Sequence, residues 1–126
     1  MTHPGDVVRA FYAAIEQQDY AAARRLLADT FLFVGWFATM TDADEYVASM
    51  QRLRGWITRI EMQRVFADGN DLCLFYNAHT IRGVVAPVAA FFTVVDGRIS
   101  TVRVVCDSRP FAELWAEQGI ERPEDH

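Results

Sequence analysis

The stretch "WITRIEMQRVFADGNDLCLFYNAHTIRG", Trp56 to Gly83, decides the fold class of this chain. In its first half, the apolar side chains of Ile60, Met62 and Phe66 alternate with charged or polar ones, which is the period of a half-buried strand. The "DGND" that follows is typical of a tight turn, and the second half reads as a returning strand. The stretch therefore predicts an antiparallel hairpin.

Two more strands follow it in the chain. The stretch "VVAPVAAFFTVV" is apolar and β-branched, and Pro87 within it predicts a bend or a bulge. Asp96-Gly97 is typical of a two-residue hairpin turn and leads into "RISTVRVVC". The second half of the chain therefore predicts four strands joined by hairpins.

The N-terminal segment carries helical signals instead. In "PGDVVRAFYAAIEQQ" the apolar side chains recur at helical spacing, and Pro4 is placed to begin the first turn. Asp19 can cap a second short helix, "YAAARRLLA", whose Leu26 and Leu27 we expect to face inward. The sequence thus begins with two helices.

A strand and a third helix separate these helices from the hairpins. The stretch "FLFVGWF", 31–37, is short and aromatic and predicts a strand. Thr41 with Asp44 resembles a capping box that opens a helix through about Leu53. Helices segregated beside an antiparallel sheet mean an α+β fold, and a sheet that curls around them can enclose an apolar cavity.

Length and charge limit the possible functions. The chain has 126 residues, so we expect a single domain over 1–126 with a frayed tail at about 119–126. Its net charge of −5 argues against a nucleic-acid partner. No apolar run reaches the ~20 residues of a membrane span, and the first residues lack a signal-peptide layout. We therefore expect a cytoplasmic protein with no membrane or nucleic-acid partner.

Several chemistries lack the residues that they need. All basic residues are arginine, so neither a lysine Schiff base nor a phosphate-binding P-loop is available, and no G-x-S-x-G motif is present. The three histidines have no zinc-site spacing, and Cys73 and Cys106 lie within apolar runs typical of buried thiols. We expect no metal and no cofactor.

Two stretches carry a family resemblance: "VVRAFYAAIEQQDYAAARRLLADTFLFVGW" near the start and "DGRISTVRVVCDSRPF" near the end. They resemble the nuclear-transport-factor-2-like superfamily, most of all its SnoaL-like branch, with a more distant similarity to ketosteroid isomerases. The resemblance implies a cystatin-like cone of curved, mostly antiparallel sheet closed by N-terminal helices. The superfamily includes isomerases, polyketide cyclases, epoxide hydrolases, dehydratases and proteins that only bind, so the fold does not decide the function.

The resemblance also implies a partner. In this superfamily the outer face of the sheet commonly pairs with a second subunit. Arg103 alternates with Val102 and Val104, and we expect it on that outer face. A homodimer is therefore the expected assembly.

The isomerase mechanism itself is not supported. That family uses a tyrosine in the first helix, an aspartate base that ends the first strand, and a protonated aspartate after a V-V-A-P-like stretch. The positions that match here are Phe11, Gly35 and Ala89, and none carries the functional group. A dienolate needs a base and hydrogen-bond donors, so we reject the standard ketosteroid isomerase reaction.

Asp107 is the first candidate catalytic residue. Many SnoaL-like proteins have a carboxylate just past the last strand, where it resembles a general acid or base in the cyclases. The alternative, which we favour, is that Asp107 or Ser108 caps a short helix near Pro110 while Arg109 pairs with the carboxylate on the surface. If Asp107 faced inward among apolar side chains, its pKa would be raised.

His79 is the second candidate, and Asn77 would assist it. Both share strand parity with Cys73, Phe75 and Ile81, a mostly apolar set, so we expect this face to point into the cavity. A core histidine that is only hydrogen-bonded is the alternative. Asn77 could orient a water or a substrate carbonyl.

Four aromatic side chains complete the predicted substrate site: Phe11, Tyr12, Trp36 and Tyr76. Most such rings fill cores, so a structural role is the alternative for each of them. Trp36 ends the predicted first strand and would narrow the cavity.

The sequence leaves three functions open. The first is a cofactor-independent acid-base enzyme of isomerase, cyclase or hydrolase type, acting on a small apolar molecule in an enclosed pocket. In it Asp107 or His79 moves the proton, and Asn77 and Tyr76 orient the substrate. The second is a non-catalytic protein that binds an apolar ligand. The third is a dimerising accessory domain.

Overall fold

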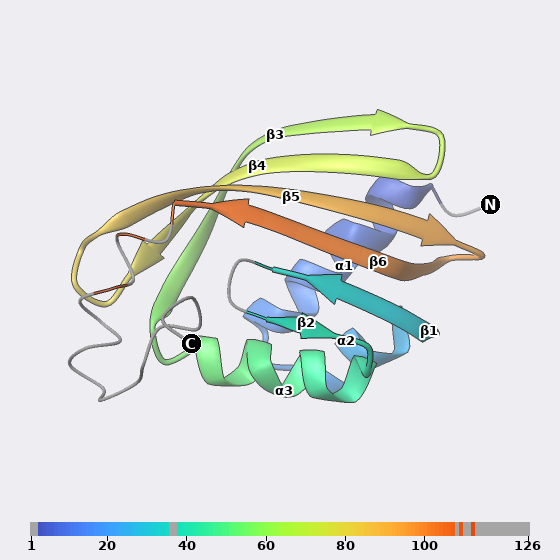
Figure 1. The fold of residues 1–126 in the computed structure, drawn as a ribbon, viewed down its shortest axis with the longest axis horizontal. Coiled ribbons are helices and arrows are strands. Elements are labelled where there is room, and N and C mark those ends of the chain that lie inside the picture. The colour runs from blue at the N-terminus through green and yellow to red at the C-terminus, as the bar shows by residue number, and fades with distance from the viewer. Residues whose placement is uncertain (1–2, 36–37, 108, 110–111, 113–126) are drawn as a thin grey trace.

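The computed structural model describes residues 3–35, 38–107, 109 and 112. The helices are α1 (Pro4–Glu16), α2 (Tyr20–Arg25) and α3 (Ala43–Leu53), and the strands are β1 (Leu27–Val34), β2 (Thr39–Met40), β3 (Ile57–Asp68), β4 (Asp71–Thr80), β5 (Val85–Val95) and β6 (Arg98–Cys106). The strands form one sheet in the order β2-β1-β6-β5-β4-β3. Every neighbouring pair is antiparallel except β1 and β6, which are parallel. The long strands curve over helices that lie on one side of the sheet, which confirms the predicted α+β fold (Figure 1).

The helices begin where the sequence predicted them, with one difference at α3. Pro4 opens α1, and the Asp19 carboxylate accepts the Ala22 N–H at 3.1 Å to cap α2. The N-cap of α3 is Asp42, whose carboxylate accepts the Asp44 N–H at 2.8 Å. The capping box expected at Thr41 is therefore wrong by one residue, because Asp42 supplies a charged acceptor closer to the first helical turn.

The hairpins follow from residues that tolerate left-handed backbone. Asp96 and Gly97 have φ of 52° and 76°, the geometry of a type I′ turn whose twist matches the flanking strands. The bulge expected at Pro87 is wrong, because β4 and β5 keep their register through that residue. The segment of β5 that pairs with β6 starts at Val88. Pro87 lies just outside this segment, so its missing N–H costs no hydrogen bond between β5 and β6.

Strand parity divides the sheet into two faces. On β4, the residues Leu72, Leu74 and Ala78 are 1% exposed and pack toward the helices. Cross-strand partners point the same way, which defines the inner face: Ile60, Met62, Val65, the even-numbered residues of β4 and β5, and Val102, Val104 and Cys106. The outer face comprises Arg59, Glu61, Arg64, Phe66, Asp68, the odd-numbered residues of β4 and β5, and Thr101, Arg103 and Val105.

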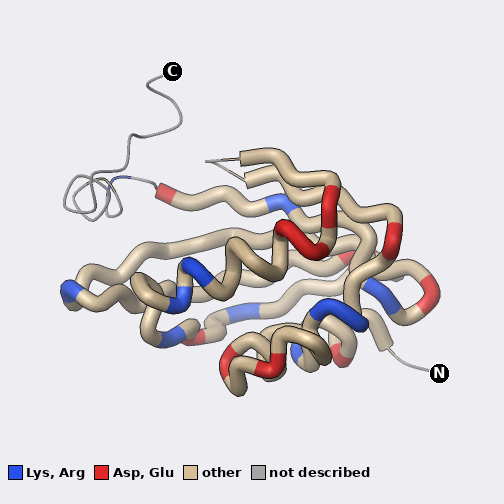
Figure 2. Tube along the Cα trace, turned by 90° about the horizontal axis from the view of Figure 1, so that it is seen from below, with Lys and Arg blue, Asp and Glu red and all other residues tan. Residues whose placement is uncertain are grey.

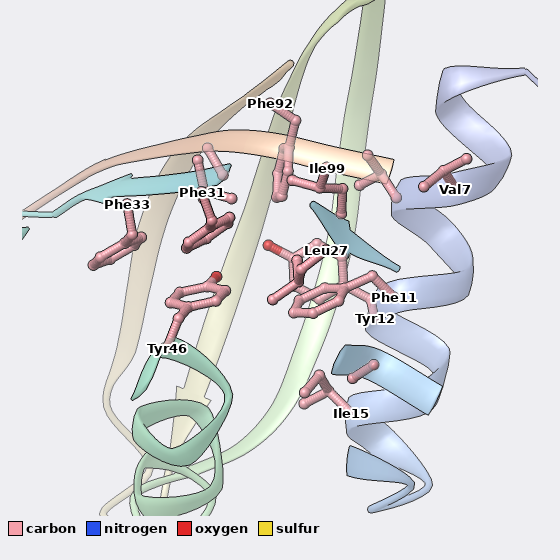
Figure 3. Close-up of a cluster of buried hydrophobic side chains, with 14 of the residues drawn as sticks. Val7, Phe11, Tyr12, Ile15, Leu27, Phe31, Phe33, Tyr46, Phe92 and Ile99 are labelled. Atoms are coloured by element: carbon pink, nitrogen blue, oxygen red, sulfur yellow. The ribbon is translucent and has the colours of Figure 1, made fainter. Parts of the chain in front are cut away.

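The core lies between the inner face and the helices. Leu72, Phe92 and Val102 at one end of the sheet pack under α1 and are at most 1% exposed. From α3, Tyr46 points toward two rings of β1, with centroids 5.1 Å from Phe31 and 4.8 Å from Phe33 (Figure 3). This aromatic layer packs α3 against the inner face of β1.

Charged residues and apolar helix length are distributed over the described part of the chain as follows. Basic and acidic positions are interspersed over the helices and strand ends in the view of Figure 2, and do not form one basic stripe. Among the described helices, none is long and apolar enough to cross a membrane. Arg103 is exposed on the outer face, as predicted.

Candidate functional site

One end of the inner face is only partly covered. The cross-strand row Met62–Tyr76–Val88–Cys106 points toward the helix side, yet Met62 is 39% exposed and Tyr76 and Cys106 are half-buried. At the other end of the same face, the side chain of Phe92 has no exposed surface. We call this region the open end; it comprises Ile60, Met62, Tyr76, Val104 and Cys106 together with Val88, which is itself buried.

Short side chains form the floor beside the open end. Ala78, Ala86 and Ala90 face inward on β4 and β5 and are at most 1% exposed. A methyl group extends far less from the sheet than the Leu72 and Phe92 side chains that fill the closed end. The inward-facing side chains of β4 and β5 are therefore shortest beside Tyr76.

Three tyrosines from three elements meet at this place. The Tyr12 ring on α1 contacts the Tyr76 ring on β4 edge to face, with centroids 5.9 Å apart, and the two hydroxyls share a hydrogen bond. Burial, with the neighbouring phenols, raises the pKa of Tyr12 and of Tyr46. Burial also raises the pKa of Tyr76 to about 12, although the hydrogen bond with Tyr12 opposes this. All three phenols are therefore neutral near pH 7 and can donate hydrogen bonds but cannot act as bases.

Cys106 lies in the same cross-strand row as Tyr76, with Val88 between them. Burial, and to a smaller extent the Asp107 charge, raises its pKa to about 11. A thiol with that pKa is protonated near neutral pH and is a poor nucleophile. Cys106 therefore contributes a soft, weakly polar wall, and the prediction of an inert thiol agrees with its surroundings.

The described inner face carries no ionised side chain. Its polar groups are the Tyr76 hydroxyl, the Cys106 thiol and the Thr80 hydroxyl, which donates to the Val84 carbonyl at 2.9 Å. Within residues 3–35 and 38–107, no three His, Cys, Asp or Glu side chains lie close enough together to hold a metal ion. The open end is thus an apolar surface with neutral hydrogen-bond donors.

Asp107 lies just beyond this surface and is engaged elsewhere. Its carboxylate accepts the Arg109 guanidinium at 2.7 and 3.0 Å and the Arg109 backbone N–H at 3.0 Å. This pairing lowers the pKa of Asp107, so the raised pKa of an inward-facing carboxyl is not observed. The geometry matches the surface interpretation, while a catalytic role for Asp107 stays a prediction.

The expected inward orientation of His79 and Asn77 is wrong. Both lie on the outer face, where His79 Nε2 is 2.9 Å from Glu61 Oε1 and 3.1 Å from a guanidinium nitrogen of Arg59. One ring nitrogen cannot donate and accept at once, and the shorter contact to a carboxylate makes Nε2 the donor to Glu61. Hydrogen bonds from His79 and Asn77 lower the pKa of Glu61. The sheet backbone separates these residues from the open end, so they lie outside any inner-face site.

The remaining residues of the predicted substrate site differ in how exposed their side chains are. Phe11 has no exposed surface, and its ring stacks at 6.1 Å on that of Tyr46, so it belongs to the core. Tyr12 is 7% exposed, and its hydroxyl is hydrogen-bonded to that of Tyr76. Trp36 lies outside the described residues. Tyr46 was not part of the predicted substrate site, and the structure adds its phenol to those of Tyr12 and Tyr76.

The structure shows why Gly35 carries no side chain and which way Ala89 points, two of the positions compared with isomerases. A Cβ on Gly35 would lie 2.6 Å from the Phe33 ring, which is 3% exposed, so the packed ring excludes any side chain there. Ala89 faces outward, and the inward position beside it is Ala90. Both residues lack an acid, so the rejection of the standard isomerase mechanism is unchanged.

Comparison with known proteins identifies the family. A family model, the SnoaL-like domain, matches residues 8–102. The chain belongs to the SnoaL-like domain family. No functionally curated protein matches this SnoaL-like chain by sequence.

Solved structures agree with this assignment. A protein from Kribbella flavida superposes with a TM-score of 0.81 at 25% identity, covering 90% of this chain and 94% of that one. An NTF2-like protein of unknown function from Cytophaga hutchinsonii has a TM-score of 0.77 at 23% identity, covering 88% and 96%. An LEH-like epoxide hydrolase from M. tuberculosis has a TM-score of 0.72 at 23% identity, covering 85% and 84%. The last two likenesses show that the SnoaL-like chain shares their fold.

Proposed function

We propose that this protein binds a small, mostly apolar molecule that carries an oxygen acceptor, such as a ketone, at the open end of the inner face. The observation that carries the proposal is the half-buried Tyr76 side chain set among apolar side chains. Apolar contacts with Met62, Val88 and Val104 would supply most of the affinity. The phenol would select molecules with an oxygen acceptor.

The Tyr12 contact prepares Tyr76 for this role. In this proposal the Tyr12 hydroxyl donates its hydrogen bond to the Tyr76 oxygen, which leaves the Tyr76 O–H to donate to a ligand. Hydrogen bonds in a chain polarise one another, and an apolar setting strengthens them. Tyr76 is therefore a better donor than an isolated phenol would be.

An acid-base enzyme of isomerase, cyclase or hydrolase type is the second candidate. The observation in its favour is that Asp107 directly follows Cys106, which shares the cross-strand row of Tyr76 with Val88 between them. In such a reaction Asp107, kept ionised by Arg109, would remove a proton, and Tyr76 would donate to the developing oxyanion. The structural likeness to an epoxide hydrolase supports this candidate only as an analogy between folds.

Binding of prodan, an apolar fluorescent ketone, tests the proposal. We expect prodan emission to shift to the blue with wild-type protein, and Tyr76→Phe to weaken binding by about 3- to 10-fold, the worth of one hydrogen bond. Tyr20→Phe is the matched control, because it removes a phenol from α2 and should leave affinity unchanged. Ala86→Trp should abolish binding by filling the floor. No binding by wild type, or equal affinity in Tyr76→Phe, would contradict the proposal.

Turnover separates the two candidates. Styrene oxide hydrolysis, followed by diol formation, should not exceed the buffer rate if the protein only binds. Turnover that falls in both Asp107→Asn and Tyr76→Phe would establish the enzyme candidate with these residues. Turnover unaffected by either change would show that the chemistry lies elsewhere.

A further inference from the structure

A groove runs between α1 and α2. It has a volume of about 400 Å³, which lies within the usual range for a small-molecule site. One face of each helix lines it, with Ala10, Ala13 and Ala14 on α1 and with Asp19, Ala22 and Arg25 at α2. Tyr12, which contacts Tyr76, is not among the lining residues, so this groove is separate from the open end.

Short side chains give the groove its apolar walls. Residues three and four apart in a helix share one face, which is the spacing of Ala10, Ala13 and Ala14. Ala22 continues the apolar wall on the α2 side. Because a methyl group extends little from the helix, these side chains do not fill the space between the two helices. They offer an apolar surface to a guest molecule.

Two opposite charges line the same groove, and both have binding capacity left. The neighbouring Arg24 is engaged in the fold, with its Nε atom 2.7 Å from Asp44 Oδ1. The Arg25 guanidinium, by contrast, has no hydrogen-bond or ion-pair partner within residues 3–35 and 38–107. Asp19 uses Oδ1 to accept the Ala22 N–H at 3.1 Å, and its other carboxylate oxygen has no partner among the described residues.

The spacing of the two charges fits a small zwitterion. Asp19 and Arg25 lie six residues apart, which is about 9 Å along a helix axis. No ion pair joins these two described side chains. Two charge-assisted hydrogen bonds of about 2.8 Å, together with the short span from ammonium to carboxylate in an α-amino acid, cover a similar distance. A ligand with one charge would leave the opposite charge of the groove unpaired.

We propose that this groove binds a free α-amino acid with an apolar side chain. The carboxylate of the ligand accepts hydrogen bonds from the Arg25 guanidinium, and its ammonium group donates to the second oxygen of Asp19. The apolar side chain of the ligand lies against the methyl groups of Ala10 and Ala13. The site does not depend on the function proposed for the open end, so the two can be tested separately.

An NMR titration with L-leucine and two singly charged analogues tests the proposal. Leucine should shift backbone amides of α1 and α2 in the wild-type protein, with a dissociation constant on the order of 1 mM for so small a ligand. Arg25→Gln should weaken leucine binding about 3- to 10-fold but should not weaken leucinamide, which has no carboxylate. Asp19→Asn keeps an N-cap acceptor, and it should weaken leucine by a similar factor but not 4-methylpentanoate, which has no ammonium group.

Variants that fill the groove complete the test. Ala13→Trp, at an exposed position of α1, should abolish leucine binding. Ala21→Trp is the matched control, because Ala21 is exposed on α2 outside the lining, and it should leave binding unchanged. Arg9→Gln is the matched charge control. Three results would overturn the proposal: leucine that shifts no amide of α1 or α2, leucine that shifts only amides around Tyr76, and leucine affinity that neither charge variant lowers.

Discussion

The ring of Tyr12 on α1 meets the ring of Tyr76 on β4 edge to face, with centroids 5.9 Å apart and planes inclined by 65°. The contact joins the buried core to the partly exposed end of the inner face, because Tyr12 is 7% exposed while Tyr76 is half-buried. The core thereby holds the half-buried Tyr76 ring in place at the open end.

Alkaline pH should destabilise the fold through these phenols. The folded pKa of Tyr76, about 12, exceeds the value of 10.0 for a free phenol. The contribution of Tyr76 to stability is therefore fully present below pH 10. Above that pH the unfolded chain loses a proton that the folded chain retains, so the free energy of unfolding falls by at most about 1.4 kcal/mol per pH unit for this group. Denaturant unfolding at stepwise pH should show a shallower decline in Tyr76→Phe. An identical decline in both proteins would disprove the raised pKa.

Gly35→Asp should not restore a base. The new side chain must displace the buried Phe33 ring, so we expect the free energy of unfolding to fall by about 2–3 kcal/mol. Gly69→Asp is the control, because a Cβ there meets nothing within 4 Å, although its φ of 60° adds some strain. If Gly35→Asp is as stable as the control, the ring does not exclude a side chain.

The titration of Asp107 reports the Arg109 pairing. The guanidinium and backbone hydrogen bonds hold the pKa of Asp107 below 3.8, so its carboxylate is stabilised above that pH and the pairing is lost as pH falls through the lowered value. Carbon-detected NMR of Asp107 in Arg109→Ala should show the pKa rising toward 3.8. A midpoint that does not move would mean that the pairing is not formed in solution.

Two neighbouring phenylalanines test the assignment of the faces. Phe92 has no exposed surface, whereas Phe91 is 44% exposed on the outer face. Phe92→Ala should lower the free energy of unfolding by about 3–5 kcal/mol, and Phe91→Ala by under about 1 kcal/mol. The reverse ranking would invert the two faces of the sheet.

The sequence predicted the fold well because its helix-start and turn residues are strong local signals. Pro4, Asp19 and Asp96-Gly97 act through local geometry, which needs no knowledge of distant contacts. Leu27 was less predictable: its helical neighbours suggested a second helix that continues past it, but it opens β1 and is fully buried beside Ile99. Tertiary pairing overrode local propensity there.

The candidate site was harder to predict, for a reason visible on β4. Both parities of that strand are mostly apolar, since Phe75 and Cys73 alternate with Leu72 and Leu74. The outward-facing side chains of β4 resemble a core face because Cys73 and Phe75 among them are apolar. Periodicity alone therefore could not decide which face of the sheet His79 lies on. Strand pairing and burial settle the choice.

The infrared carbonyl stretch of bound prodan tests the central claim most directly. A hydrogen bond from the Tyr76 phenol weakens the ketone C=O bond, so the band should lie at lower frequency in the wild-type complex than in the Tyr76→Phe complex. It should also rise part of the way in Tyr12→Phe, which removes the donor to Tyr76. The same frequency in all three complexes would contradict a ligand oxygen held by Tyr76.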